Sequence, residues 1–284
     1  MCIRDRGGAQ NPIPAARVPE VKDSPDFRTT NAFNLRYVAF NNQLAPFNDV
    51  RVRQAFAHAV DKATLADVVL GGTVTAADRI LPPGMPASEL PIEPLAFDPD
   101  RGKALLAEAG IDPAAFTLTL TYGVEGDNER VVTVLQSMWQ ENLGITVTLE
   151  PLELSTFSAR LNDTYQDPAN GLQAYYSVWG TIYPDPQYFL SQVLRTGVGN
   201  NNPHFSNAEF DALVDEADVI TGDFARRAQL YNQAEQIAVR EVGWLPLFNG
   251  QVNVLVRECV QGVAVTGLFS AYVIPDYSAL RGCQ

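Results

Sequence analysis

The segment from residue 116 to residue 149 constrains the fold of this chain more than any other stretch. In FTLTLTY (116–122), apolar residues alternate with three threonines, which predicts a strand with one buried face. A helix is predicted over 127–143, where apolar residues recur at helical spacing until Gly144 ends the helix. Residues 145–149 alternate again. Strand, helix and strand at this spacing predict a βαβ unit, in which a right-handed crossover joins two parallel strands. The helix is expected to bury Val132, Leu135, Trp139 and Leu143.

The residues before this unit predict a strand and three helices. Residues 33–40 alternate imperfectly, as a strand does, and Asn48 or Asp49 caps the helix that follows. Asp61 begins a second helix, which ends at Gly71-Gly72 and is expected to turn Leu65, Val68 and Val69 inward. A proline-rich surface loop is predicted over 80–97. Asp98 and Pro99 begin the third helix.

The residues after the βαβ unit continue the alternation. A short helix around 154–161 and an apolar strand at 173–179 extend the βαβ pattern. Ser206 and Glu209 form a capping box that opens another helix.

The last part of the chain predicts one long helix and two strands. The helix spans 223–242, and Val-rich segments at 252–256 and 260–265 are interpreted as strands that return to another sheet. The predicted fold class is therefore α/β, with βαβ units, a mixed sheet and flanking helices.

Composition excludes several classes of partner. Hydrophobic residues make up 46% of the 284 residues, enough for a sizeable core, and the net charge is −13. Such an acidic chain repels nucleic acid, so no nucleic-acid partner is expected. No run of 18 apolar residues occurs, so no membrane-spanning helix is predicted. None of the three cysteines forms a CxxC pair, and no zinc or dithiol site is expected. Cys259 and Cys283 are either a disulfide or two free thiols.

Motifs for catalysis and for metal binding are missing from the sequence. His58 is interpreted as a half-exposed helical residue, whereas His204 lies in an Asn-rich loop where it can touch a ligand. Neither histidine stands in an HExxH or HxH arrangement, and no nucleophile elbow, P-loop or GxGxxG fingerprint occurs. The chain is therefore not predicted to be an enzyme, and no cofactor or metal is expected.

Aromatic residues concentrate in YYSVWGTIYPDPQYF (175–189). Trp179 ends the predicted strand, and Tyr183 begins a stiff proline-containing loop. Ligands of open α/β sheets bind beyond the carboxyl ends of strands, where an aromatic ring can cover an apolar ligand face. Trp179 and Tyr183 are thus candidates to line a pocket, although the same rings can equally fill the core. Tyr188 and Phe189 are interpreted as packing residues.

Six segments of the chain together resemble the family 5 bacterial extracellular solute-binding proteins. They occur in the family's order across roughly residues 31–260 and are PFNDVRVRQAFAHAVDKATL (46–65), ILPPGMP (80–86), FDPDRGKALLAEAGI (97–111), WGTIYPDPQYFL (179–190), NNPHFSNAEFDALVDEA (201–217) and WLPLFNGQVNVLVR (244–257).

The resemblance implies a type II periplasmic-binding-protein-like fold of two lobes with a ligand cleft between them. Residues 1–40 would supply a loop and a hinge strand from the end of lobe 1, and 41–244 the ligand-binding lobe 2. Residues 245–284 would supply the hinge return and the C-terminal strands of lobe 1. The remainder of lobe 1 and the signal segment are expected to precede this chain. The location implied is periplasmic or otherwise extracytoplasmic, and the protein is expected to be a monomer.

The resemblance also assigns candidate ligand-binding residues, namely Tyr176, Trp179, Gly180, Thr181, Tyr183, Phe248 and Asn249. In peptide-binding members, the Trp of this segment is followed three residues later by an Asp that holds the peptide amino group. Ile182 stands at that position here. An apolar side chain cannot replace a charge-assisted hydrogen bond, so a free peptide amino group is not the expected recognition feature.

The function implied is capture of a small solute for the permease of an ABC importer. The ligand classes left open are a short peptide, an oligosaccharide, an opine-like compound and a metal complex. The alternatives are a binding module of an envelope sensor or chaperone, and, less favoured, a periplasmic hydrolase on a similar scaffold.

Overall fold

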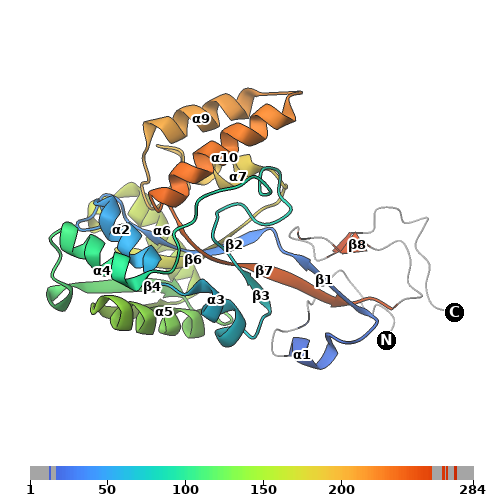
Figure 1. Cartoon of the computed structure of the whole chain (residues 1–284), viewed down its shortest axis with the longest axis horizontal. Helices are drawn as coiled ribbons and strands as arrows, with labels where there is room; N and C mark the ends of the chain where they lie inside the picture. The colour runs from blue at the N-terminus through green and yellow to red at the C-terminus, as the bar shows by residue number, and fades with distance from the viewer. Residues whose placement is uncertain (1–12, 14–16, 258–263, 266, 268–271, 274–284) are drawn as a thin grey trace.

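The computed structural model describes residues 13, 17–257, 264–265, 267 and 272–273. Cys259, Cys283 and the segment 260–263 lie outside these residues, so the disulfide alternative is not addressed by the structure. Within the described part of the chain, a mixed β-sheet runs through the centre, and helices cover both of its faces (Figure 1).

The sheet has the strand order β1-β7-β2-β6-β4-β5, and β3 pairs with β7 beside this path. A separate two-stranded pair consists of β8 and β9. The strands are β1 Phe27–Asn31, β2 Asn34–Phe40, β3 Val74–Ala76, β4 Thr117–Gly123, β5 Thr146–Leu152, β6 Ala174–Gly180, β7 Leu245–Leu255, β8 Ala264–Val265 and β9 Tyr272–Val273.

In the part of the chain that the structure describes, the helices include three short turns of other helical types. The α-helices are α1 Val18–Val21, α2 Val50–His58, α3 Lys62–Thr64, α4 Pro99–Glu108, α5 Asn128–Leu143, α6 Leu154–Gln166, α7 Pro186–Phe189, α8 Ser191–Leu194, α9 Ala208–Val219 and α10 Phe224–Arg240. The others are the π-helical turn η2 Leu65–Val69 and the 3-10 turns η3 Pro113–Ala115 and η4 Pro168–Asn170.

The predicted βαβ unit is confirmed. Strands β4 and β5 are parallel, with Leu118 paired to Val147, and α5 connects them. The predicted stripe of α5 is buried, and Trp139 also donates a hydrogen bond of 3.0 Å to the carbonyl of Phe56 on α2. Gly144 closes the helix with a φ of 76°, a conformation that glycine adopts without steric cost. The crossover therefore locks α5 onto one face of the sheet.

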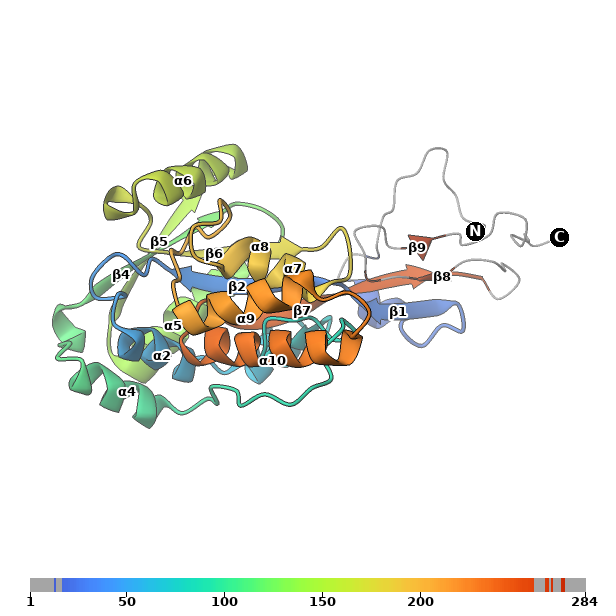
Figure 2. The ribbon, with the colours of Figure 1, turned by 90° about the horizontal axis from the view of Figure 1, so that it is seen from above.

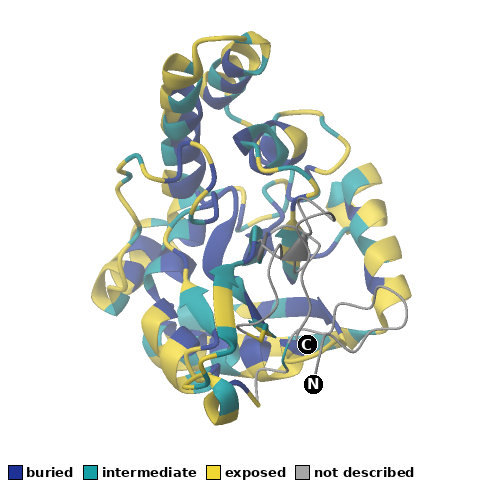
Figure 3. Cartoon of the chain, turned by 90° about the vertical axis from the view of Figure 1, so that its right-hand side faces the viewer, coloured by how far each residue is buried: buried dark blue, intermediate teal, exposed yellow. Residues whose placement is uncertain are grey.

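Strand β2 separates two hydrophobic cores. Val38 and Phe40 point to the core beneath α2, α4 and α5, whereas Tyr37 and Ala39 point to the core beneath α6 to α10. This is the two-residue alternation of a strand buried on both faces. The views in Figure 1 and Figure 2 show the two helical layers on either side of the sheet, and Figure 3 shows the buried strands between exposed outer helical surfaces.

One end of the sheet extends beyond these helices. The distal half of β7 pairs with β1, from Gln251 opposite Asn31 to Leu255 opposite Phe27. At this end of the sheet, the buried apolar residues Ala32 and Val252 form a small cluster separate from both main cores. Figures 1 and 2 both show β1 projecting away from the helical layers.

The helix predicted after Asp61 is present but does not keep α-helical spacing. Asp61 caps it, and Gly71 and Gly72 end it at φ values of 64° and 68°, as expected. From Leu65 onward the chain forms a π-helical turn, in which Leu70 N–H bonds to the Leu65 carbonyl at 3.1 Å. The wider turn rotates later side chains away from the predicted stripe. Val68 is consequently 73% exposed, so its predicted inward orientation was wrong.

The capping box predicted at Ser206 was also wrong. Asn207 caps α9, and its side-chain oxygen accepts hydrogen bonds from Glu209 N–H (2.9 Å) and Phe210 N–H (3.0 Å). The Ser206 hydroxyl instead bonds to Thr196 at 3.0 Å. Both residue types cap helices, so the sequence alone does not distinguish adjacent candidates.

The predicted surface loop at 80–97 is partly internal. Ile80, Leu81 and Met85 are buried, because an ion pair fastens the start of the loop to α10. The Glu235 carboxylate is fully buried and accepts hydrogen bonds from Ile80 N–H (2.9 Å), Leu81 N–H (2.7 Å) and the Arg79 guanidinium. Arg79 also donates to the carbonyl of Leu90 at 2.7 Å and to that of Ser88.

We predict that Arg79→Met lowers the free energy of unfolding by about 3–5 kcal/mol, because it leaves the buried Glu235 carboxylate without its counter-charge. Burial raises the pKa of Glu235, and Arg79 opposes that rise. In the variant, the folded state therefore binds a proton more readily than the unfolded state. The difference from wild type should shrink as the pH falls and Glu235 becomes neutral. Urea unfolding at two pH values measures the difference in unfolding free energy between Arg79→Met and the wild type.

Two variants serve as controls for this measurement. Arg226→Met removes an ion pair with Glu216 that is about half exposed on both sides, and should cost less than about 1 kcal/mol. The double variant Arg79→Met/Glu235→Leu should recover part of the loss, because the unpaired charge is gone. Equal losses for Arg79→Met and Arg226→Met would contradict the prediction.

Candidate functional site

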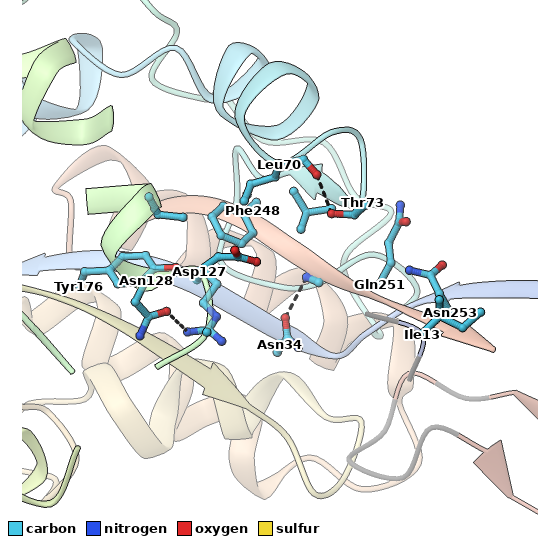
Figure 4. Close-up of a pocket in the computed structure, with 15 residues that line it drawn as sticks. Ile13, Asn34, Leu70, Thr73, Asp127, Asn128, Tyr176, Phe248, Gln251 and Asn253 are labelled. Atoms are coloured by element: carbon cyan, nitrogen blue, oxygen red, sulfur yellow. Dashed lines mark hydrogen bonds between the residues drawn. The ribbon is translucent and has the colours of Figure 1, made fainter. Parts of the chain in front are cut away.

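A pocket of about 340 Å³ lies over one face of the sheet, where β2, β6 and β7 approach the start of α5 and the end of η2. It is lined by Ile13, Asn34, Arg36, Leu70, Thr73, Val74, Gly126, Asp127, Asn128, Val131, Tyr176, Phe248, Gly250, Gln251 and Asn253. In Figure 4, Tyr176, Asp127 and Asn128 lie at one end, Gln251 and Asn253 at the other, and Phe248 and Asn34 between them. The size is that of a small-molecule site.

The floor of the pocket is set by the pairing of three strands. Arg36 on β2 lies opposite Phe248 on β7, and two residues along, Val38 lies opposite Tyr176 on β6. The register between β2 and β7 shifts between Arg36 and Tyr37, as at a β-bulge. Because of this irregularity, the consecutive residues Leu247 and Phe248 both face the α5 side of the sheet. The bulge therefore places an aromatic ring in the pocket wall.

Arg36 is oriented by an asparagine. Its guanidinium donates a hydrogen bond of 3.1 Å to the side-chain oxygen of Asn128, and the Asn128 amide nitrogen donates to the Gly123 carbonyl at 2.8 Å. The guanidinium carbon also lies 6.0 Å from the centre of the Tyr176 ring. Burial raises the pKa of Tyr176 to about 12, although the charge of Arg36 opposes the rise. Tyr176 is therefore a neutral hydroxyl at physiological pH.

Asn34 is fixed by β7. Its side-chain oxygen accepts from Gly250 N–H at 2.9 Å, and its carbonyl accepts from the Asn249 side chain at 2.7 Å. Asn249 is thus buried against the backbone that supports the pocket rather than among the pocket-lining residues. At the far end, the side-chain oxygen of Asn253 is buried without a hydrogen-bond partner among the described residues. A donor placed there would satisfy it.

The aromatic residues at the end of β6 lie on the other side of the sheet. Trp179 packs against the core beneath α7 to α10, stacks on Tyr188 with ring centres 5.2 Å apart, and donates to the Tyr188 carbonyl at 2.9 Å. Tyr183 meets Tyr188 edge to face, with ring centres 4.9 Å apart. Neither ring lines the pocket.

Thr181, in the segment between these two rings, forms hydrogen bonds within the chain. Thr181 N–H bonds to the Phe33 carbonyl at 3.0 Å, and its hydroxyl bonds to the Tyr183 carbonyl. Gly180 is exposed and pairs with Asn34, so the end of β6 adjoins the pocket through Asn34. Ile182 is 70% exposed. Asp185 caps α7 and forms an ion pair with Arg227 at 2.7 Å.

The two histidines have local partners. A ring nitrogen of the half-exposed His58 lies 2.7 Å from the Ala96 carbonyl. His204 stacks on Tyr165 with ring centres 5.5 Å apart, and its Nε2 lies 3.2 Å from the Thr164 carbonyl. Within the described residues, no group of three or more His, Cys, Asp or Glu side chains is arranged to hold a metal ion. The same residues include no helix with the length and apolarity to cross a membrane.

Of the seven residues predicted to bind ligand, the pocket brings together Tyr176 and Phe248. Sequence reasoning missed Arg36, Asn34 and Asn128, the main polar groups around them. One signal was available, because Arg36 is a lone charge inside NLRYVAF, a strand that is otherwise largely apolar. A charge inside a buried strand needs a partner or a function.

The comparisons with known proteins agree on one family. The family model described as "Bacterial extracellular solute-binding proteins, family 5 Middle" matches residues 8–201. Heme-binding protein A of Haemophilus influenzae is 33% identical over 220 residues, covering 75% of this chain and 39% of that protein. The periplasmic oligopeptide-binding protein OppA of Salmonella typhimurium is 32% identical over 221 residues, covering 75% and 39%.

The fold is shared with solved structures. The unliganded open form of the periplasmic murein tripeptide-binding protein MppA superposes with a TM-score of 0.78 at 25% identity, covering 88% of this chain and 49% of that one. The structures matched are type II periplasmic binding proteins, which confirms the predicted α/β fold class. The chain spans less than half the length of these proteins. The family and these relatives are binding proteins rather than enzymes.

We predict that Asn128→Ala lowers the free energy of unfolding by about 1–3 kcal/mol, because it leaves the Gly123 carbonyl without its donor and frees the Arg36 guanidinium. Asn170→Ala is the control, since Asn170 is exposed and bonds only to the nearby Asp167; it should change stability by about 0.5 kcal/mol or less. Urea unfolding of both variants measures the difference, and equal stabilities would show that Asn128 does not support the pocket.

Proposed function

This chain belongs to the bacterial extracellular solute-binding proteins, family 5, and on that premise we propose that it is part of the solute-capturing component of an ABC importer. The resemblance in the six sequence segments is thereby confirmed. The proposed solute is a small, peptide-like molecule or a related compound. The single observation that supports a binding role most directly is the pocket at Arg36, Tyr176 and Phe248, which combines apolar walls with a few directed polar groups.

The names of the relatives support a small solute without fixing its identity. They name heme, oligopeptides and a murein tripeptide as ligands. Heme has a planar, largely apolar ring, and heme and peptides all carry carboxylates. A pocket with aromatic side chains on its floor and polar groups at its ends suits that kind of molecule.

The proposed site has two parts, one in the pocket and one at the end of β6. Tyr176 and Phe248 form a wall of the pocket, while Trp179, Gly180, Thr181 and Tyr183 form the adjoining end of β6. Asn249 supports the site by holding Asn34. We propose that solute bound in the pocket also reaches this strand end, where the exposed Gly180 and the half-buried Trp179 and Tyr183 lie.

The proposed lobes follow the same geometry. Residues 41–244 would form the ligand-binding lobe, with β2 and β7 as the two hinge crossings. Strand β1 and the distal half of β7, which extend beyond the helical layers, would belong to a second lobe that closes over the solute. Ligand would favour closure by its greater affinity for the closed state. The closed form would dock on the importer's permease, outside the cytoplasmic membrane, as a monomer without enzymatic activity.

We predict that Phe248→Ala weakens solute binding at least tenfold, because it removes an aromatic wall of the pocket. Thermal-shift screening of the chain against a library of peptides, sugars and organic acids would identify solutes, and calorimetry would give the affinities. Phe248→Leu is measured in the same way, because that variant disturbs the core less. Circular dichroism checks that both variants are folded.

Two further variants separate the parts of the site. Trp179→Ala should also weaken binding at least tenfold if solute reaches the end of β6. Phe224→Ala, at a position 76% exposed on α10, should leave binding unchanged. If neither Phe248 variant alters the affinity of any solute found in the screen, the pocket is not the binding site.

A further inference from the structure

We propose that Arg36 is the anion-holding residue of the pocket, and that the solute carries a carboxylate attached to an apolar body. This inference rests on the proposed function, because it assigns a chemical class to the solute of the same pocket. It follows from three features of the pocket, namely an unpaired cation, a helix start beside it, and the nature of the remaining walls.

Arg36 has more hydrogen-bond donors than partners. A guanidinium carries five N–H groups and keeps its charge at all physiological pH values. One of these groups bonds to the neutral side chain of Asn128, and the cation lies against Tyr176. Within the described residues, Arg36 forms no ion pair, although the chain has 33 acidic residues against 20 lysines and arginines. A half-buried charge held in place by a neutral amide is poised for an external counter-ion.

The beginning of α5 favours the same sign of ligand. Gly126, Asp127 and Asn128 line the pocket at the N-terminus of this 16-residue helix. The first turn of a helix carries a partial positive charge and free N–H groups. Asp127 stands at the N-cap position but makes no side-chain hydrogen bond to that turn. The backbone N–H groups of the helix start therefore add to the attraction that Arg36 exerts on an anion, and the carboxylate of Asp127 opposes it.

The other walls select among anions. Leu70, Val74, Val131 and Phe248 give the pocket an apolar lining beside the cation. Asp127 adds one negative charge to the pocket lining, and it forms no ion pair within the described residues. A second negative charge on the ligand would be repelled there, which disfavours a phosphate dianion. A single carboxylate matches the planar fork of Arg36, and an attached ring or alkyl group fits the apolar lining.

The test uses a matched pair of probes, 1-naphthaleneacetate and 1-naphthaleneacetamide, which share one apolar body and differ in charge. Binding to the 284-residue chain is measured by ligand-detected NMR titration at low ionic strength. The acid should bind at least tenfold more tightly than the amide. Arg36→Gln should abolish this preference. Asp127→Asn should strengthen binding of the acid a few-fold, because it removes the repulsive charge.

Arg226→Gln is the matched control, since it removes the same charge from an exposed position on α10. It should keep the tenfold preference, and circular dichroism checks that each variant is folded. The inference is overturned if acid and amide bind the wild-type chain equally well, or if the preference for the acid survives Arg36→Gln. In either case, solute binding that depends on Phe248 would still support the pocket as the binding site. If neither probe binds, but neutral solutes bind in a Phe248-dependent way, the inference fails alone. If no Phe248-dependent binding of any solute is found, the proposed function of the pocket fails as well.

Discussion

The structure depends on the pairing of β2 with two neighbours at the centre of the sheet. Strand β2 is antiparallel to both β6 and β7, which lie far away in the sequence, and it sends alternate residues into two separate cores. The stacked pair Tyr37 and Trp244, with ring centres 3.9 Å apart, ties β2 to the start of β7 on one face. On the other face, Phe40 packs against Phe47 and Phe56. One slip of register would exchange these two sets and destroy both cores.

The same pairing explains why the candidate pocket forms on the α5 face of the sheet. From Phe40 back to Tyr37, the strand is covered on both sides by helices. At Arg36 the bulge brings Phe248 alongside, and the covering helix α5 is only just beginning. The apolar layer over the sheet thus ends at a cation, an aromatic ring and a helix start. Trp179 lies on the opposite face, where α7 and α10 continue to cover the sheet. The aromatic cluster at 175–189 therefore serves both faces, with Tyr176 at the pocket and Trp179 against the second core.

Local periodicity was enough to predict much of this fold. The βαβ unit, its helix α5 and the caps at Asp49, Asp61 and Asp98 follow from spacing and residue type within a few residues. The errors lie where tertiary contacts override local pattern. Val68 is rotated outward by a π-helical turn, and Ile80 and Leu81 are drawn inward by Glu235. The strand expected at 252–256 is the distal part of a longer strand, β7, which begins at Leu245 and continues through a bulge.

The candidate site was less predictable because its chemistry comes from residues that only the folded chain brings together. Arg36 and Asn128 are 92 positions apart, and Asn34 and Gly250 are 216 apart. The aromatic residues form a cluster in the sequence. The polar residues that give the pocket its selectivity are isolated residues in segments far apart. A charge inside an apolar strand is nevertheless costly unless something compensates for it. Because the folded chain supplies Arg36 with an amide instead of a carboxylate, the compensating charge is left for a ligand to bring.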